Sequence, residues 1–164
     1  MDIFNREGRL LFQIPEDWDP IFEDRDLLAG ADLRGAQLRV AMLGNENLGK
    51  ACLVGADLYQ AFLNTTDLRY ADLEGADLRG ADIEDSDLGF SNLKNADLSL
   101  SLIGGHTRLG GANLVGASLD GADLAGALYD SSTTFPTGFD PRVHGMLTFE
   151  ELEDLLRSST ETTP

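Results

Sequence analysis

The sequence has very little cysteine and few basic residues. Cys52 is its single cysteine, which excludes an internal disulfide and any multi-cysteine zinc or iron–sulfur site. The 12 lysines and arginines are outnumbered by 29 acidic residues, so the formal net charge is -17. Because nucleic acids and anionic membranes are bound through cationic side chains, we expect neither as a direct partner.

Long hydrophobic runs are also absent. No apolar stretch is long enough to span a membrane, and the N-terminal segment has acidic residues and no apolar run of signal-peptide length. With the single cysteine, this predicts a cytoplasmic location. The 164 residues suit one domain, and a hydrophobic content of 42% is sufficient for a packed core.

Groups that could perform catalysis are scarce. His106 and His144 lie at no recognisable motif spacing from a serine, a cysteine or each other. Cys52 lies in the repeat between Asp32 and Asp72, a setting that does not favour a reactive thiolate. We therefore expect no enzyme, no cofactor and no metal site.

What the sequence has in abundance is a repeat of five residues. An apolar residue occupies the centre of each unit, Ala usually lies two residues before it, and Asp or Asn lies between. Leu or Ile stands at 28, 33, 38, 43, 48, 53, 58, 63, 68, 73, 78, 83, 88, 93, 98 and 103, then at 109, 114, 119 and 124. These are twenty pentads.

A period of five fits neither a helix nor a flat strand. On a helix the leucines would rotate around the axis, and on a strand they would alternate between the two faces. The chain must therefore turn a corner in every pentad, with Ala and the central Leu pointing inward. This indicates an all-β solenoid.

Matching residues recur every twenty positions, which predicts four sides in each coil and about five coils. The Ala slot is polar at Asp26, Glu46, Thr66, Ser86 and, after an extra residue, Thr107. Tyr70 and Phe90 are also twenty residues apart, as are Asp57, Asp77 and Asp97. The extra residue, near Gly104-Gly105-His106, is expected to form a bulge at a corner.

The segment ADLEGADLRGADIEDSDLGFSNLKNADL resembles the pentapeptide repeat family. The resemblance covers residues 26 to 126 and implies a right-handed quadrilateral β-helix. The segment that follows, ALYDSSTTFPTGFDPRVHGM, is similar to the exit segment of small cyanobacterial members of the family. The resemblance leaves function open.

The ends of the stack need covers, and the aromatic residues indicate where these lie. Most aromatics flank the repeats: Phe4, Phe12, Trp18 and Phe22 precede them, and Tyr129, Phe135, Phe139 and Phe149 follow. We expect an N-terminal cap over 1–25, the β-helix over 26–130, an exit loop and helix over 131–157, and a disordered tail over 158–164. A capping box at Thr148-Phe-Glu-Glu151 starts the helix, which is expected to close the last coil or to bind a partner.

Two acidic features leave alternatives open. Asp57, Asp77 and Asp97 stack closely enough for a hard cation such as calcium, although each can instead accept hydrogen bonds from its own corner. Glu46 occupies a slot that should point into the barrel, where we expect a satisfied structural carboxylate. Its role is not assigned.

Two outer columns are candidate protein-binding surfaces. One contains Lys50, Tyr70 and Phe90, for which we expect stacked rings beside a cation. The other follows the edge between the third and fourth faces, where slots usually filled by Gly and Asp are apolar. It contains Val40, Met42, Phe62, Leu100 and Leu102 and is interrupted by Gly80 and Asp82.

Two functions are compatible with this pattern. The first is a non-enzymatic scaffold that binds another protein or forms a homodimer. The second, implied by the family resemblance, is a DNA mimic that binds DNA gyrase. The charge argues against the second, because residues 28–126 carry only -7 and Arg34, Arg39, Arg79 and Lys94 lie on two adjacent faces.

Overall fold

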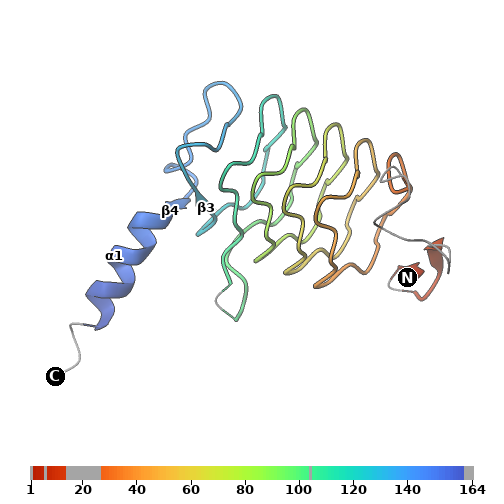
Figure 1. The fold of residues 1–164 in the computed structure, drawn as a ribbon, viewed down its shortest axis with the longest axis horizontal. Coiled ribbons are helices and arrows are strands. Elements are labelled where there is room, and N and C mark those ends of the chain that lie inside the picture. The colour runs from red at the N-terminus through yellow and green to blue at the C-terminus, as the bar shows by residue number, and fades with distance from the viewer. Residues whose placement is uncertain (1, 6, 14–26, 104, 161–164) are drawn as a thin grey trace.

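The chain forms a rod of stacked coils with a short hairpin at one end and a helix at the other (Figure 1). The computed structural model describes residues 2–5, 7–13, 27–103 and 105–160. The named elements in this part of the chain are β1 (Asp2–Phe4), β2 (Leu10–Gln13), β3 (Leu128–Tyr129), β4 (Leu147–Thr148) and α1 (Phe149–Thr160).

Four ladders of parallel backbone bridges run along the rod, so each coil has four sides. We name each face after one residue. The Cys52 face contains Asp32, Cys52, Asp72, Asn92 and Ser118; the Asp57 face contains Gln37, Asp57, Asp77, Asp97 and Asp123; the Phe62 face contains Met42, Phe62, Asp82, Arg108 and Leu128; the Asp67 face contains Asn47, Asp67, Asp87, Asn113 and Thr134. Partners in the first coils are twenty residues apart, which confirms the four-sided β-helix predicted from the columns.

The pentad sequence explains both the core and the corners. Central leucines such as Leu78 are fully buried, and the preceding alanines such as Ala76 line the same core. Each corner is a turn in which the amide of an Ala donates to the carbonyl of the Leu three residues earlier, as Ala81 does to Leu78 at 3.0 Å. The last residue of the pentad lies at positive φ, which explains why it is so often glycine.

In the part of the chain that the structure describes, nine non-glycine residues also occupy this strained corner position. Two of them, Thr65 and Val40, are β-branched residues at φ 57°, which is rare, and Val40 is the apolar one of the two. Its cost is about 1 kcal/mol or more. A residue kept in an unfavourable conformation is a reason to look for a function there.

We expect Val40→Gly to raise the free energy of unfolding by about 1 kcal/mol, since glycine adopts this φ without a steric penalty. Urea denaturation would measure the change. Gly35→Ala, at another corner of positive φ (66°), should instead lower stability. A Val40→Gly protein less stable than the wild type would contradict the assignment of strain.

The regular stack is interrupted by a longer insertion than the sequence suggested. The bridge from Asp82 to Arg108 spans 26 residues, so six extra residues are present rather than one. Residues 101–103 and 105–106 belong to a loop that leaves the lower edge of the rod (Figure 1), and at its base the Ser101 amide donates to the Gly105 carbonyl at 2.8 Å. Ile103, predicted as a core centre, is therefore exposed.

The insertion also changes the column of Thr107. Because Asp82 pairs with Arg108, Thr107 lies next to Ala81 and not next to Ser86. The predicted polar column thus ends at Ser86, whose neighbour in the next coil is Ala112. Thr66 and Ser86 remain adjacent, and the Thr66 amide donates to Ser86 Oγ at 3.1 Å.

At the N-terminal end, β1 and β2 pair antiparallel and contact the first coils. Ile3 is buried in the core cluster, and the Gln37 amide donates to the Phe4 carbonyl at 2.8 Å. Trp18 and Phe22, which were expected in the N-terminal cap, lie outside the described residues.

At the C-terminal end, β3 pairs in parallel with β4, which leads directly into α1. The capping box is confirmed: the Thr148 amide donates to Glu151 Oε2 at 2.8 Å, and the Glu151 amide donates to Thr148 Oγ1 at 3.1 Å. The helix ends at Thr160, three residues later than predicted, and residues 161–164 of the predicted tail lie outside the described residues.

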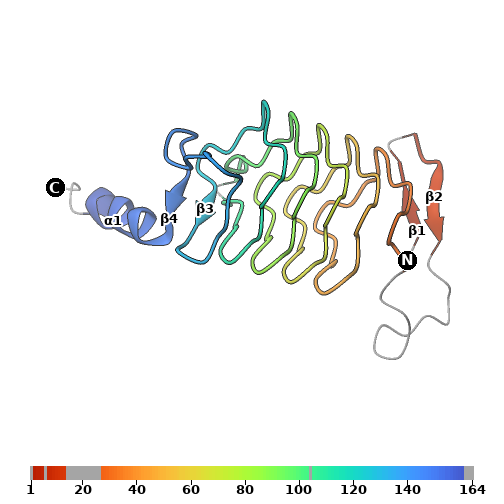
Figure 2. The ribbon, with the colours of Figure 1, turned by 90° about the horizontal axis from the view of Figure 1, so that it is seen from above.

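The predicted closure of the last coil by α1 is not confirmed. The helix extends away from the stack (Figures 1 and 2), and Leu155 and Leu156 are exposed. Instead, Phe135 and Phe139 from the exit segment pack against the core. Their rings belong to a continuous cluster with Tyr129 and His144.

A carboxylate organises the turn after β3. Asp130 Oδ1 accepts hydrogen bonds from the Ser132 hydroxyl at 2.6 Å and from the amides of Ser132, Thr133 and Gly111 at 2.9 to 3.1 Å. These donors stabilise the charged form and lower the pKa of Asp130 from 3.8 to about 2.

Because the pKa of Asp130 is lower in the folded state, its contribution is complete above pH 3.8 and is lost as the pH falls toward 2. We therefore expect the wild-type melting temperature to fall more steeply across this window than that of Asp130→Asn. Thermal unfolding at several pH values would test this, with the exposed Asp120→Asn as the control for lost charge. Parallel curves for wild type and Asp130→Asn would contradict it.

Candidate functional site

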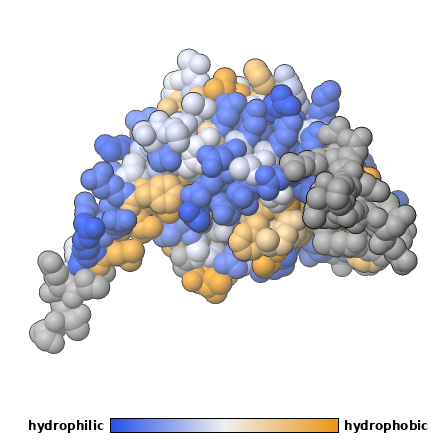
Figure 3. Space-filling model, viewed as in Figure 1, coloured by the Kyte–Doolittle hydropathy of each residue, from blue (hydrophilic) through white to orange (hydrophobic). Residues whose placement is uncertain are grey.

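Three apolar side chains lie together at one edge of the rod. Val40, Met42 and Phe62 are 54%, 75% and 39% exposed, and Met42 and Phe62 are bridge partners on the Phe62 face. Elsewhere in the repeats these slots usually hold Gly or Asp. We call these three residues the apolar edge. Figure 3 shows separate apolar areas, with hydrophilic areas between them, on the lower part of the rod.

Beyond Phe62 the same face becomes polar. Asp82 and Arg108 follow it in the ladder, and Arg108 pairs with Glu84 at 2.8 Å. Leu102 does not occupy the next Asp slot, as the sequence suggested, because it lies in the inserted loop; Arg108 takes that slot. The column was predicted with an interruption at Gly80 and Asp82, and the prediction that Leu102 resumes it after Asp82 is wrong.

The loop nevertheless leaves the rod along the same edge as Val40, which is the corner residue of that edge in the first coil. The next corner residues are Gln60 and Gly80, and a side chain at Gly80 would approach Gln60 Cγ within 3.2 Å and Ser101 Cβ within 3.0 Å. Gly80 thus allows the loop base to pack closely. Leu100 and Leu102 are both exposed and form a second apolar area at the loop, separate from the apolar edge.

The predicted ring stack is confirmed. The centroids of Tyr70 and Phe90 are 5.3 Å apart with an angle of 8° between the rings. The expected cation contact is not found, since the cation–ring contacts among the described residues involve Arg39, Arg79 and Arg108 and not Lys50. Whether this column binds a protein stays a prediction.

Arginines accompany the carboxylate ladder on the Asp57 face. Arg39 pairs with Asp57 at 3.3 Å, and Arg79 pairs with Asp77 at 2.6 Å and with Asp97 at 3.4 Å. Tyr59 lies between the arginines, with Arg39 4.2 Å and Arg79 5.6 Å from its centroid.

These pairs bear on the cation hypothesis. The bonded Arg79 holds the pKa of Asp77 below its usual value, as expected for a carboxylate with a cationic partner. Within the described ranges, no three His, Cys, Asp or Glu residues are grouped as metal ligands. The stacked carboxylates are explained by their arginines and give no support to a calcium site.

The remaining candidate groups have structural surroundings. His106 Nδ1 lies 2.7 Å from the Gly126 carbonyl, and His144 stacks on Phe139 at 4.5 Å. Cys52 is half-buried in its ladder, as expected. Glu46 is half-buried and interacts with other residues, consistent with a structural role.

Sequence reasoning missed one contact between the rod and the helix. Phe149, the first residue of α1, lies 5.9 Å from the Arg108 guanidinium and close to Gly110. A side chain at Gly110 would meet the Phe149 ring at 3.3 Å. Glycine at this outward slot gave no distinctive signal, because Gly44, Gly49 and Gly89 occupy it in other pentads. In the described part of the chain, no helix is long and apolar enough to cross a membrane.

Comparison with known proteins agrees with the geometry. The family model described as "Pentapeptide repeats" matches this chain in eight copies, over residues 47–85, 63–99 and 105–127. The search of curated proteins gives no match.

Several solved structures are similar, including three pentapeptide repeat proteins. The pentapeptide repeat protein alr5209 from Nostoc PCC 7120 is 36% identical over 62% of this chain and 84% of that chain, with a TM-score of 0.43. A pentapeptide repeat protein from the Arabidopsis thaliana thylakoid lumen is 26% identical over 79% and 82%, with a TM-score of 0.56. HetL from Nostoc sp. strain PCC 7120, involved in heterocyst differentiation regulation, is 34% identical over 61% and 52%, with a TM-score of 0.37.

Proteins of this kind fold as right-handed quadrilateral β-helices and are generally not enzymes. The four ladders, the Leu and Ala core and the identity to the Nostoc protein together establish that this chain belongs to the pentapeptide repeat family.

Proposed function

We propose that the protein is a non-enzymatic scaffold that binds another protein through the apolar edge. The observation that carries this proposal is the exposure of Val40, Met42 and Phe62 in slots that elsewhere in the repeats mostly hold Gly or polar residues. Neither core packing nor solubility requires apolar side chains in these slots, and the backbone of Val40 is in addition strained at positive φ. Clustered exposed apolar side chains are typical of interaction sites.

The rod favours this use of its surface. Its backbone bonds and buried leucines fix the outward slots at regular spacing, so the contact residues lose little freedom on binding. An aromatic residue such as Phe62 beside a flexible Met42 is a suitable centre for a protein interface. The loop with Leu100 and Leu102 provides a second contact farther along the same edge.

The test is the double variant Met42→Lys and Phe62→Lys. Proteins bound in extracts of the native host would be captured by cross-linking and identified by mass spectrometry, and the oligomeric state would be measured by light scattering. We expect a partner held by the wild type to be lost by the double variant. Val143→Lys, at an exposed valine in the exit segment, is the matched control and should retain it.

Circular dichroism would establish that the variants are folded. A folded double variant with unchanged partners and unchanged oligomeric state would contradict the proposal. A wild-type dimer that the double variant abolishes would identify the partner as a second copy of the chain.

The charge distribution gives less support to the DNA-mimic alternative. A mimic of duplex DNA presents unpaired negative charge, whereas Arg39, Arg69 and Arg79 neutralise carboxylates on two faces of the rod. A supercoiling assay with purified gyrase tests this directly. We expect no inhibition by the protein.

A further inference from the structure

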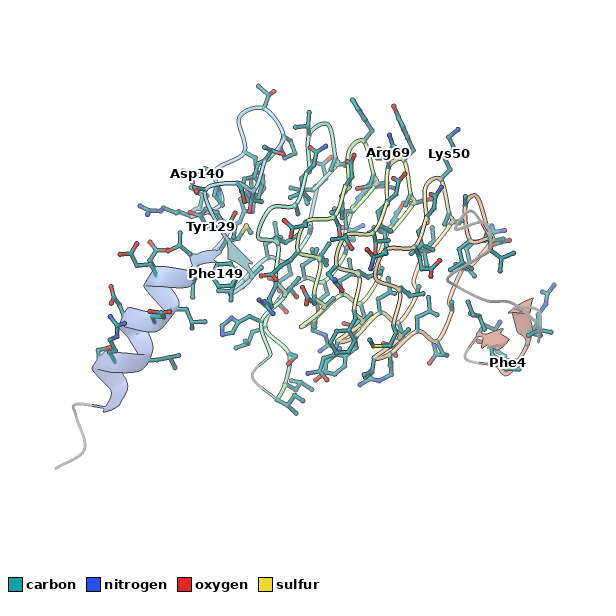
Figure 4. The ribbon with its side chains drawn as sticks, viewed as in Figure 1. Phe4, Lys50, Arg69, Tyr129, Asp140 and Phe149 are labelled. Atoms are coloured by element: carbon teal, nitrogen blue, oxygen red, sulfur yellow. The ribbon has the colours of Figure 1, made fainter. Side chains whose placement is uncertain are left out.

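The edge of the rod opposite the apolar edge carries a second feature that the proposed function does not use. Its corner residues are Lys50, Tyr70, Phe90 and Gly116, one in each successive coil. Going around a coil, Val40 and Lys50 lie two corners apart, so the two edges are diagonally opposite. Figure 4 shows Lys50 and Arg69 along the upper edge, whereas the inserted loop leaves the lower one.

The ring stack has a fixed direction. A side chain at Gly116 would come within 2.5 Å of Phe90 Cδ1, so the Phe90 ring lies directly against this glycine. Tyr70 in turn stacks on Phe90. The second face of the Tyr70 ring is therefore directed toward the coil of Lys50, and Tyr70 and Phe90 remain 56% and 59% exposed.

A hollow of about 340 Å³ lies on this side of Tyr70. Ala29 and Gly49 contribute to its lining, and they occupy the outward slot that Arg69 fills in the next coil. The absence of larger side chains at these two positions creates the space. The hollow is thus bounded by the Tyr70 ring, small residues, Asn47, the ion-paired Asp67 and Arg69, and the Lys50 side chain.

Lys50 is the charge that this region leaves uncompensated. Arg69 pairs with Asp67 at 2.6 Å and lies 3.8 Å from Asp87, whereas none of the ion pairs of the described residues includes Lys50. The ladder residue of the coil of Lys50 is Asn47, an uncharged residue, where the next coils have Asp67 and Asp87. A ligand in the hollow would therefore meet an aromatic face and a free ammonium group.

We propose that this hollow binds a peptide segment in which an aromatic residue lies beside a carboxylate. The peptide ring continues the stack on Tyr70, and the carboxylate pairs with Lys50. Because the lining residues Lys50, Arg69 and Tyr70 are exposed, the hollow cannot enclose a small molecule as ligand pockets usually do, which favours a segment of a protein. The site is independent of the apolar edge, and its position allows a second partner to bind at the same time.

Blocked tetrapeptides test the two parts of the proposed ligand separately. Isotope-labelled protein would be titrated with Gly-Trp-Glu-Gly, with a version in which Leu replaces Trp, and with one in which Gln replaces Glu, while NMR follows the backbone amides. We expect the first peptide to shift the Gly49 and Lys50 signals and each altered peptide to bind about two- to tenfold more weakly.

Variants at the same corner assign the contacts. Tyr70→Asn should weaken the binding of Gly-Trp-Glu-Gly by about two- to tenfold, and asparagine is tolerated there because Asn95 occupies an equivalent corner with φ 56°. Lys50→Gln should abolish the preference for Glu over Gln, and Gln60 shows that glutamine also fits such a corner. Thr65→Asn, at a corner of a different edge (φ 57°), is the control and should leave the binding of this peptide unchanged.

Equal binding of the three peptides, or unchanged binding by a folded Tyr70→Asn, would overturn the proposal. Binding of N-acetyltryptophan as tight as that of the tetrapeptide would overturn the assignment to a peptide. Because Met42 and Phe62 take no part, failure here is distinguishable from failure of the apolar edge to bind a partner.

Discussion

Replacing Leu78 by alanine should lower the free energy of unfolding by about 2 to 5 kcal/mol, the range for emptying a core leucine site. Leu78 is 0% exposed and lies in the middle of the stack, between Leu58 and Leu98 of the neighbouring coils. Its amide donates to the Asp97 carbonyl at 2.7 Å, and its carbonyl accepts from Ala81. These backbone bonds hold the walls of the site apart, so the cavity cannot collapse, which favours the upper part of the range.

Urea denaturation followed by circular dichroism would measure this effect. Leu102→Ala is the matched control, because Leu102 is a leucine of the same chain that is 86% exposed in the loop. Its replacement should change stability by less than about 0.5 kcal/mol. A loss under about 0.5 kcal/mol for Leu78→Ala would contradict the inward position of this leucine.

The four-sided coil could be predicted from the sequence because every pentad repeats the same information. An odd period excludes helix and strand, and matching side chains twenty residues apart fix the number of sides. The stack of Tyr70 on Phe90 followed from the same spacing. The capping box of α1 was predictable for a different reason, since its hydrogen bonds involve only four consecutive residues.

The inserted loop could not be predicted in the same way. Ser101, Leu102 and Ile103 fit the small, outward and central positions of a pentad, so the local pattern favours another side of the coil. The decision depends instead on contacts with the preceding coil, where Arg108 rather than Leu102 pairs with Asp82. Such contacts are distant in sequence, and the error carried over to the edge predicted from Leu100 and Leu102.

The orientation of α1 was missed for a related reason. The apolar residues of the helix predict a face that packs, but they do not say against what. The exit segment already places Phe135 and Phe139 on the core, and therefore Leu155 and Leu156 are left exposed. Only the first turn of the helix, through Phe149, contacts the rod near Arg108.

Thr107 shows how the rod tolerates its insertion, and removing its hydroxyl should have the second large effect on stability. At a regular corner the amide of the last pentad residue donates to a carbonyl of the next coil, as Gln60 does to Arg79 at 3.0 Å. At Gly80 the loop disturbs this ladder, and the amide donates to Thr107 Oγ1 at 2.9 Å instead. The hydroxyl then donates to the Leu78 carbonyl at 2.9 Å, so it completes the network from a fully buried position.

We expect Thr107→Val to lower the free energy of unfolding by about 1 to 3 kcal/mol, because the shape is kept while the Gly80 amide loses its acceptor. Thr107→Ser retains the hydroxyl and should keep the network, losing only the contribution of one methyl group. Hydrogen exchange at the Gly80 amide separates the two effects: exchange should accelerate in the valine variant and remain slow in the serine variant. If the valine variant protected Gly80 as well as the wild type does, the threonine would not be the group that replaces the interrupted ladder bond.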